Sequence, residues 1–582
     1  MHIRGDKEKS RVIIYQLLPR LFSNTSEHNV LYGSAQENGC GKMNHISAKA
    51  LDEIHKLGAT FIWYTGMIEH ATCTDYSNWG IRRDNPLIVK GVAGSPYAIK
   101  DYYDIAPDLA EDVAARMKEF EQLVKRTHDA SMGVIIDFVP NHVAREYFSD
   151  AMPEGEEGLG EKDNRDAAFL RSNNFYYLPG EALELPPEVK DLPYVKVSGK
   201  THYTERPARA TGNDQFIKDP SFHDWYETVK LNYGFDFQNK NKKHFKPTPD
   251  TWYKMRDILL FWAGKGVDGF RCDMAEMVPV EFWQWVIPQV KEKYPAITFI
   301  AEIYSPKAYK SYIDVGMFDY LYDKIGMYDT LRGVITGQTS ARMITRVWQE
   351  NDSLNSRMVR FLENHDEQRI ASSEFAGSAR GGFPAMALVA LMHTGPVMVY
   401  FGQECGEPAE GRTGFSGDDG RTSIFDYCHV PHHSQWINKL AFDGGAMDTG
   451  SKQIRQFYER LINLAGDEVF SYGAFYDLMW ANPDSKDFDG RHIYCFLRYT
   501  PRKVFLVLTN FDAQGPVRVN IRFPEDVWEL LDKKGRFSIY GKDVLWDQKE
   551  FFSDSIEVEN NGLVFVIDSQ SVYAFELDIS VE

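Results

Sequence analysis

Residues 133–142 read GVIIDFVPNH, an apolar run that contains Asp137 and leads directly into Asn141 and His142. A run of this length without polar alternation is typical of a strand buried on both faces, as in a parallel sheet. Similar runs occur at residues 12–18 (VIIYQLL), 59–64 (ATFIWY), 266–272 (GVDGFRC), 298–303 (TFIAEI), 358–362 (MVRFL) and 396–401 (PVMVYF). With a weaker run at residues 318–322, eight strands are predicted.

Helix-like stretches separate several of these runs. Residues 111–130 place Met117, Phe120 and Val124 at helical spacing on one face. Residues 251–263 form a second such stretch, for which Asp250 is the expected N-cap. Because strand and helix alternate and eight strands are predicted, we expect an α/β fold, specifically a (β/α)8 TIM barrel.

Two regions break the alternation. Residues 144–233 are rich in Glu, Pro, Gly and Asn and lack periodicity, which predicts an inserted domain B after the third strand. From about residue 471 onward the pattern is one of alternating strands, which predicts a C-terminal β-sandwich over residues 471–582. The catalytic barrel would then comprise residues 1–143 and 234–470.

Composition limits the classes of partner. The chain of 582 residues has a formal net charge of −19, which would repel phosphate backbones and argues against nucleic acid as a partner. The six cysteines are scattered without a C-x-x-C pair, and the charged first residues resemble no export signal. No apolar stretch is long enough to cross a bilayer. We therefore expect a soluble, cytoplasmic protein that binds no membrane, while the oligomeric state stays open.

Acidic side chains gather where predicted strands end. They are Asp137, Asp273 and Glu302, and Asp366 in the segment FLENHDE. The carboxyl ends of barrel strands converge on one face, so these four groups are expected to share one site with Arg271, His142 and His365.

Glycosidic bond cleavage requires such a set. One carboxylate attacks the anomeric carbon while a second carboxyl group protonates the leaving oxygen. We assign Asp273 as nucleophile, kept ionised by Arg271, and Glu302 as general acid/base with a raised pKa. Asp366 would brace the transition state by binding sugar hydroxyls.

The segments DFVPNH, GFRCD, AEIY and FLENHDE together resemble the four signature regions of the α-amylase superfamily of retaining glycoside hydrolases and transglycosylases. The resemblance extends from VIIYQLLPRLF to GPVMVYFGQE. It implies Asp273, Glu302 and Asp366 as catalytic residues and a structural role for Asp137 near the nucleophile. The substrate-binding residues that it implies are Tyr97, His142, Arg271, His365 and Arg421.

The chain departs from the family where many α-amylases bind calcium. Asn141 matches one calcium ligand, but Lys230 stands where an Asp usually precedes Leu-Asn, and Glu276-Met277 replaces a Lys-His pair. One oxygen ligand does not make a calcium site. We therefore expect no required cofactor and no metal, with Asn141 as a ligand only if calcium binds. We expect His429, His432 and His433 to lie in a surface loop, and Glu404 to be structural.

Three functions stay open at this stage. The first is an α-amylase-type hydrolase of α-1,4-glucans such as starch, glycogen or maltodextrins. The second is a transglycosylase or isomerase of the same superfamily, such as a glucanotransferase, maltosyltransferase or trehalose synthase, in which a sugar accepts in place of water. The third is a non-catalytic sugar-binding relative, which the presence of all three acidic residues disfavours.

Overall fold

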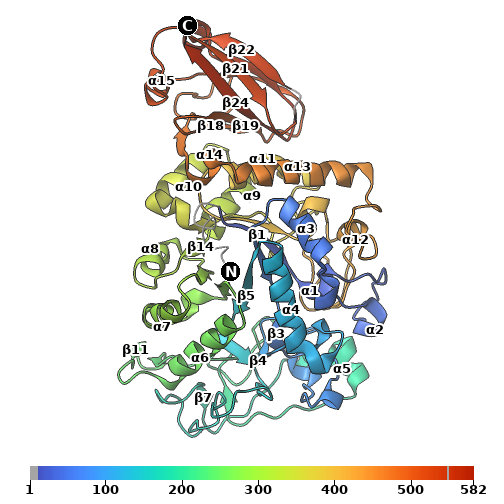
Figure 1. Ribbon diagram of the computed structural model, residues 1–582. Coiled ribbons are helices and arrows are strands. Elements are labelled where there is room, and N and C mark those ends of the chain that lie inside the picture. Colours follow the sequence, from blue (N-terminus) through green and yellow to red (C-terminus); the bar gives the residue numbers. More distant parts are fainter. Residues whose placement is uncertain (1–10, 547–548, 582) are drawn as a thin grey trace.

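The computed structural model describes residues 11–546 and 549–581. We based the expectation of no export signal on the charged residues at the N-terminus. All of these except Arg11 lie outside the described residues. Three regions stack along the long axis of the molecule (Figure 1). A barrel forms the middle, the segment that contains β7 and α5 lies at one end, and the last strands of the chain lie at the other.

The barrel strands correspond one for one to the eight predicted runs. They are β1 (Ile13–Leu17), β2 (Phe61–Tyr64), β5 (Gly133–Phe138), β12 (Gly269–Cys272), β13 (Thr298–Ala301), β14 (Tyr320–Tyr322), β15 (Met358–Val359) and β16 (Val397–Tyr400). They pair in parallel in the order β15-β14-β13-β12-β5-β2-β1-β16, and a parallel bridge between Arg360 and Val397 joins the two ends. The TIM-barrel prediction is therefore confirmed.

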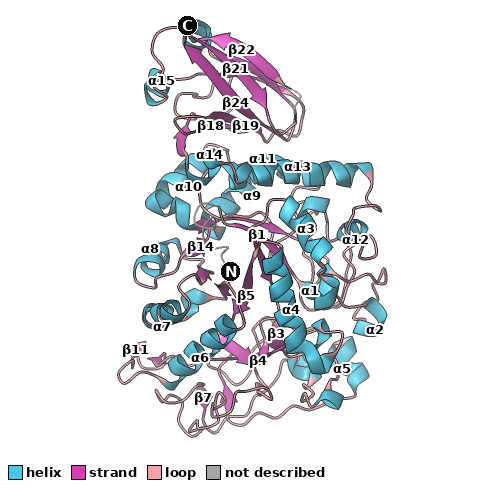
Figure 2. Cartoon of the chain, viewed as in Figure 1, coloured by secondary structure: helices cyan, strands magenta, loops and turns pink. Residues whose placement is uncertain are grey.

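Helices surround the barrel (Figure 2). They include α3 (Ala48–Lys56), α4 (Arg116–Asp129), α6 (Asp250–Gly264), α7 (Val280–Lys293), α8 (Pro306–Asp314), α9 (Asp329–Ile335), α10 (Met343–Asn351), α11 (Phe383–Leu391) and α13 (Thr449–Ala465). Two predicted helix starts were wrong. The helix expected from residue 111 begins at Arg116, because Asp112 caps a separate 3-10 turn instead. Asp250 is the first residue of α6 rather than its cap, and Pro249 precedes it.

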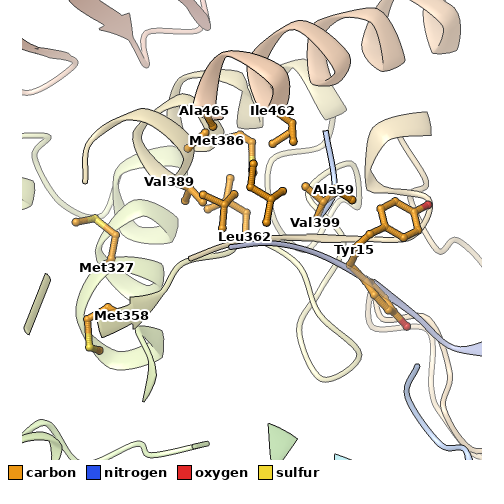
Figure 3. Packing of buried hydrophobic residues seen from close by; sticks show 14 of the residues in the cluster. Tyr15, Ala59, Met327, Met358, Leu362, Met386, Val389, Val399, Ile462 and Ala465 are labelled. Atoms are coloured by element: carbon orange, nitrogen blue, oxygen red, sulfur yellow. The ribbon is translucent and has the colours of Figure 1, made fainter. Parts of the chain in front are cut away.

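Alternate side chains of the strands form two separate cores. One set, including Ile14, Trp63, Ile135, Ile300 and Met398, fills the barrel interior. The other set packs outward against the helices, where Met386 and Val389 of α11 lie near Val399 of β16 (Figure 3). Burial on both faces explains why the strand sequences are continuously apolar.

The predicted insertion has little regular structure. It starts at β6 (His142–Ala144), which pairs antiparallel with β9 (Thr228–Lys230), so the segment leaves and returns at the same place. Between them lie β7 (Tyr177–Leu178), α5 (Pro193–Ser198) and β8 (Ala208–Arg209). Because β6 closely follows the end of β5, this pairing places the segment next to the carboxyl ends of the barrel strands.

The last strands form two antiparallel sheets, as expected for a C-terminal β domain. Six of them are β17 (Ala474–Asp477), β18 (Ile493–Tyr499), β19 (Val504–Asn510), β24 (Ser571–Val581), β21 (Phe537–Asp543) and β22 (Glu550–Asp554), in that spatial order. The second sheet contains β20 (Val517–Ile521) and β23 (Leu563–Ile567). The exact boundaries at residues 143/144, 233/234 and 470/471 stay predictions. Among the described residues, no helix combines the length and apolarity that a membrane span needs.

Candidate active site

Strand periodicity delivers the acidic side chains to one place. Side chains alternate across a strand, so a residue two positions beyond an inward-facing one also points into the barrel. Ile135 and Ile300 belong to the interior core, and Asp137 and Glu302 follow each of them at that spacing. Arg271 lies opposite Asp137 in the pairing of β12 with β5. These groups therefore meet at the carboxyl ends of the strands.

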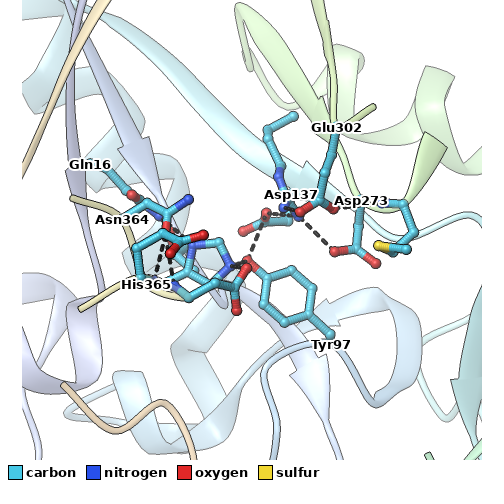
Figure 4. A network of polar contacts seen from close by, with 12 residues as sticks. Gln16, Tyr97, Asp137, Asp273, Glu302, Asn364 and His365 are labelled. Atoms are coloured by element: carbon cyan, nitrogen blue, oxygen red, sulfur yellow. Dashed lines mark hydrogen bonds and ion pairs between the residues drawn. The ribbon is translucent and has the colours of Figure 1, made fainter. Parts of the chain in front are cut away.

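Arg271 contacts three carboxylates, those of Asp137, Asp273 and Glu302, which lie close together in Figure 4. Its Nη1 lies 2.7 Å from Asp273 Oδ1, and its Nη2 lies 2.8 Å from Glu302 Oε1. Asp137 Oδ1 lies 3.5 Å from Nη1, and Nε donates to the Tyr322 hydroxyl at 3.2 Å. The guanidinium is fully buried, so these charge-assisted contacts act in a medium of low dielectric. One cation thus orients both carboxylates that the sequence assigns to the reaction.

Glu302 lies in an environment that suits a proton donor. Its Oε2 accepts a hydrogen bond from the backbone N–H of Met274 at 2.7 Å, and its Oε1 accepts one from the Tyr304 hydroxyl at 2.7 Å. Burial raises the pKa of Glu302 to about 6, against the opposing effect of Arg271 and with help from the charge of Asp273. Met274 adopts a left-handed conformation with φ of 43°, which is uncommon for a side chain of this kind.

Burial also raises the pKa of Asp273, and Arg271 only partly offsets that effect. The sequence predicted that Arg271 favours the ionised form of Asp273, and the arginine does act to lower the pKa of this carboxyl group. The prediction missed the larger effect of burial, because how deeply a side chain is buried depends on the tertiary structure.

His365 links the remaining predicted residues. Its Nε2 lies 2.6 Å from the Tyr97 hydroxyl and 3.0 Å from Asp366 Oδ2, and its ring stacks on Tyr97 with centroids 5.1 Å apart. The side-chain amide of Gln16 donates to its Nδ1 at 2.8 Å. Burial acts to lower the pKa of His365, but Asp366 reverses the shift and raises it overall. Burial acts to raise the pKa of Asp366, but the contact with His365 outweighs it and lowers the pKa to about 2, so this carboxylate is ionised at neutral pH.

These groups surround a cleft of about 330 Å³. Of the predicted residues, the cleft is lined by Tyr97, His142, Asp273, Glu302 and Asp366. Arg271 and His365 are fully buried and do not line the cleft themselves. Each contacts a residue that does, Glu302 for Arg271 and Asp366 for His365. Arg421 is part-exposed; its Nε donates to the backbone oxygen of Asp366 at 2.7 Å, and its Nη1 pairs with Asp419 at 2.5 Å. Its role in substrate binding stays a prediction.

Sequence reasoning missed several residues of the site. Gln16 interrupts the apolar run at residues 12–18 two positions after the inward-facing Ile14, and a polar residue at such a position is a usable signal. Tyr304 follows Glu302 by two residues. Trp225, whose ring centroid lies 5.0 Å from that of His142, comes from the irregular insertion and carries no such signal.

Asn141, the residue expected to bind calcium if calcium is present, instead contacts an ammonium group. Lys230 Nζ donates to Asn141 Oδ1 at 2.6 Å and lies 2.6 Å from Asp214 Oδ1. The Asn141 amide nitrogen donates to the backbone oxygen of Gly212 at 2.8 Å. The Lys230 side chain is almost completely buried. A cation already supplied by the chain does not fit a calcium ligand set, which requires six or more free oxygens.

The expectation that the histidines at residues 429–433 lie in a surface loop was wrong for His432 and His433, because both belong to helix α12 (Pro431–Ile437). His433 is also fully buried, with Nε2 lying 2.9 Å from the backbone oxygen of Phe22. Its neighbours in space come from a segment about 30 residues earlier, which a local pattern of histidines does not reveal.

Comparisons with known proteins identify relatives of this chain. A family model described as the catalytic domain of α-amylase matches residues 16–424. α-Amylase 3 of Dictyoglomus thermophilum is 23% identical over 402 residues, which cover 65% of this chain and 68% of that protein. An α-1,4-glucan:maltose-1-phosphate maltosyltransferase of Cereibacter sphaeroides is 42% identical over 69 residues, so the chain spans only 12% of that relative's length. The solved maltogenic α-amylase of Thermotoga neapolitana aligns with a TM-score of 0.60 and 20% identity, covering 97% of this chain and 98% of that one.

Proposed function

The chain belongs to the α-amylase family of enzymes, and we propose that it is a retaining hydrolase of α-1,4-glucosidic bonds in starch, glycogen or maltodextrins. The observation that carries this proposal is the placement of Asp273 and Glu302 on the two terminal nitrogens of one buried arginine. Retention requires two carboxyl groups only about 5–5.5 Å apart, and a shared guanidinium favours so short a spacing.

In the proposed reaction, Asp273 attacks the anomeric carbon while Glu302 gives its proton to the leaving oxygen. The bond from sugar to leaving group breaks as the bond to Asp273 forms. Glu302, now ionised, takes a proton from water, whose oxygen displaces Asp273 and restores both carboxyl groups to their starting states. Asp366, ionised and facing the cleft, would bind sugar hydroxyls, and Tyr97 offers a ring face for the sugar.

The pH dependence follows from the same pair. The free enzyme is active when Glu302 is protonated and Asp273 is ionised. We expect kcat/KM to fall as pH rises through about 6, where Glu302 loses its proton. The value of kcat/KM should also fall at acid pH, as Asp273 becomes protonated. This fall should occur at a higher pH than for an ordinary aspartate, because burial raises the pKa of Asp273. A profile measured on maltoheptaose, whose sugar leaving group needs a proton, checks both limbs, and a rate that is flat from pH 5 to pH 9 would contradict the role of Glu302.

A transglycosylase is the second candidate, because the local match to a maltosyltransferase favours it. The choice of acceptor concerns the leaving-group side, where a second cavity of about 400 Å³ opens beside Glu276 and Met277. Tyr176 and Phe237 add aromatic walls from the insertion and the segment that follows it. Aromatic rings of this kind suit the apolar face of an acceptor sugar.

Product analysis with maltoheptaose separates the two candidates. A hydrolase releases shorter products and creates a new reducing end at each cleavage. A transferase forms products longer than the substrate while the number of reducing ends stays constant. Chromatography combined with a reducing-end assay measures both, and constant reducing ends with longer products would overturn the hydrolase proposal.

We also propose that catalysis needs no calcium at Asn141, since the Lys230 ammonium serves as the cation there. Activity should therefore be unchanged by EGTA. Replacing Lys230 with methionine should lower the free energy of unfolding by about 3 kcal/mol, because one partner of a buried polar cluster is lost. Urea unfolding measures this.

The matched control is Lys218→Met, which removes a lysine on the protein surface that pairs with Glu184. Its effect should be within about 0.5 kcal/mol. Loss of activity with EGTA, or equal stability of Lys230→Met and Lys218→Met, would contradict the proposal that Lys230 serves in place of calcium at Asn141.

A further inference from the structure

A second group of reactive side chains lies outside the cleft. Glu404 and Cys405 occupy the 3-10 turn η11 (Gln403–Cys405) that follows β16, and His433 lies in α12. Their ligand atoms lie within 4.8 Å of one another, and all three residues are fully buried. None of them lines the cleft, so the catalytic mechanism makes no use of this cluster.

The hydrogen bonds leave one ligand atom free on each of the two polar side chains. Because a carbonyl oxygen can only accept, the contact of His433 Nε2 with Phe22 places the proton on Nε2 and leaves Nδ1 with a lone pair. Glu404 Oε1 accepts from the Tyr15 hydroxyl at 2.7 Å and from Arg455 Nη1 at 3.0 Å. His433 Nδ1 and Glu404 Oε2 have no hydrogen-bond partner among the described residues. Buried polar atoms without partners are uncommon and need an explanation.

A metal ion explains both free atoms. A metal-bound histidine commonly donates its other N–H to a backbone carbonyl, as His433 does to Phe22. We propose that Glu404, Cys405 and His433 bind a structural zinc ion. One sulfur, one nitrogen and one oxygen ligand suit Zn²⁺, whereas calcium and magnesium prefer oxygen alone. Binding displaces the Cys405 thiol proton to solvent, and the fourth position is left to water.

The distances require only a small adjustment. Ligand atoms around a tetrahedral zinc lie about 3.3–3.8 Å apart, and the three residues have ligand atoms within 4.8 Å of one another, so the side chains need to close by about 1 Å at most. The ion would join the two ends of the segment 406–432. This segment includes Ile424 and Phe425, which line the cleft, and Arg421, which contacts the backbone of Asp366. The zinc ion thus fixes the base of a loop that shapes the substrate site.

Refolding tests the site, because a chelator cannot readily reach buried ligands in the folded chain. The full-length protein is unfolded in guanidinium with a chelator, refolded with Zn²⁺ or Co²⁺, and desalted before its metal content is measured. We expect a single tightly held zinc ion per chain, and a thiolate-to-cobalt charge-transfer band in the Co²⁺ form. Cys405→Ser should lose both, while the matched control Cys428→Ser, which replaces a buried cysteine outside the cluster, should keep both.

Two results would overturn the proposal. One is refolded wild-type protein that retains no zinc and shows no thiolate-to-cobalt band. The other is Cys405→Ser that retains as much zinc as the wild type. If Cys405→Ser does not fold, the cobalt spectrum of the wild type decides alone. None of these readouts depends on glucan cleavage, so failure of this proposal is distinguishable from failure of the proposed function.

Discussion

Asp273→Asn should lower kcat on α-glucans by on the order of 10⁴-fold or more, because the amide cannot form the covalent bond to the anomeric carbon. The substitution preserves the shape of the side chain. Arg271 keeps Glu302 as an ionic partner, so the fold should persist. Rates measured by release of reducing ends, together with circular dichroism, test this expectation.

The matched control for Asp273 is Asp314→Asn. Asp314 is a half-exposed residue at the end of α8 that pairs with Lys310. Its loss should leave the rate within about twofold of the wild type, as for surface changes remote from the site. A folded Asp273→Asn protein with a rate near that of the wild type would show that another group is the nucleophile.

Glu302→Gln should be nearly as damaging on natural glucans, by on the order of 10³-fold or more, because glutamine cannot protonate the leaving oxygen. The size of the loss should depend on the leaving group. An α-glycosyl fluoride leaves without a proton, so its first step should be far less affected. The comparison of kcat/KM for maltoheptaose and for a maltosyl fluoride measures this difference.

Added azide provides a second readout for Glu302. As an anionic nucleophile it needs no general base, so it should accelerate release of the glycosyl group from Glu302→Gln but not from the wild type. The control Glu350→Gln, at a mostly exposed position in α10, should behave as the wild type does. An equal loss on both leaving groups, without rescue by azide, would argue that Glu302 acts only in binding.

The fold was largely predictable because the barrel strands carry a strong local signal. Burial on both faces makes a run such as residues 133–139 continuously apolar, and even the weak run at residues 318–322 contains β14. Helix ends were less predictable. Asp112 fits an N-cap equally well whether an α-helix or a 3-10 turn follows, and the choice depends on packing.

The catalytic side chains could be placed together because barrel geometry brings all strand ends to one face. Contacts made by segments outside the barrel strands could not be predicted. The irregular insertion brings Lys230 to Asn141 only through the pairing of β6 with β9. The burial that raises the pKa of Asp273 and the partners of His433 likewise depend on tertiary packing.

Identification of the covalent intermediate tests the central claim most directly. A 5-fluoro-α-glycosyl fluoride should form a glycosyl–enzyme ester that breaks down slowly enough to be digested and analysed by peptide mass spectrometry. We expect a single added glycosyl group on the peptide that contains Asp273, at that residue. An enzyme that turns over glucans while its adduct maps to a different residue, or while no adduct forms at all, would contradict it.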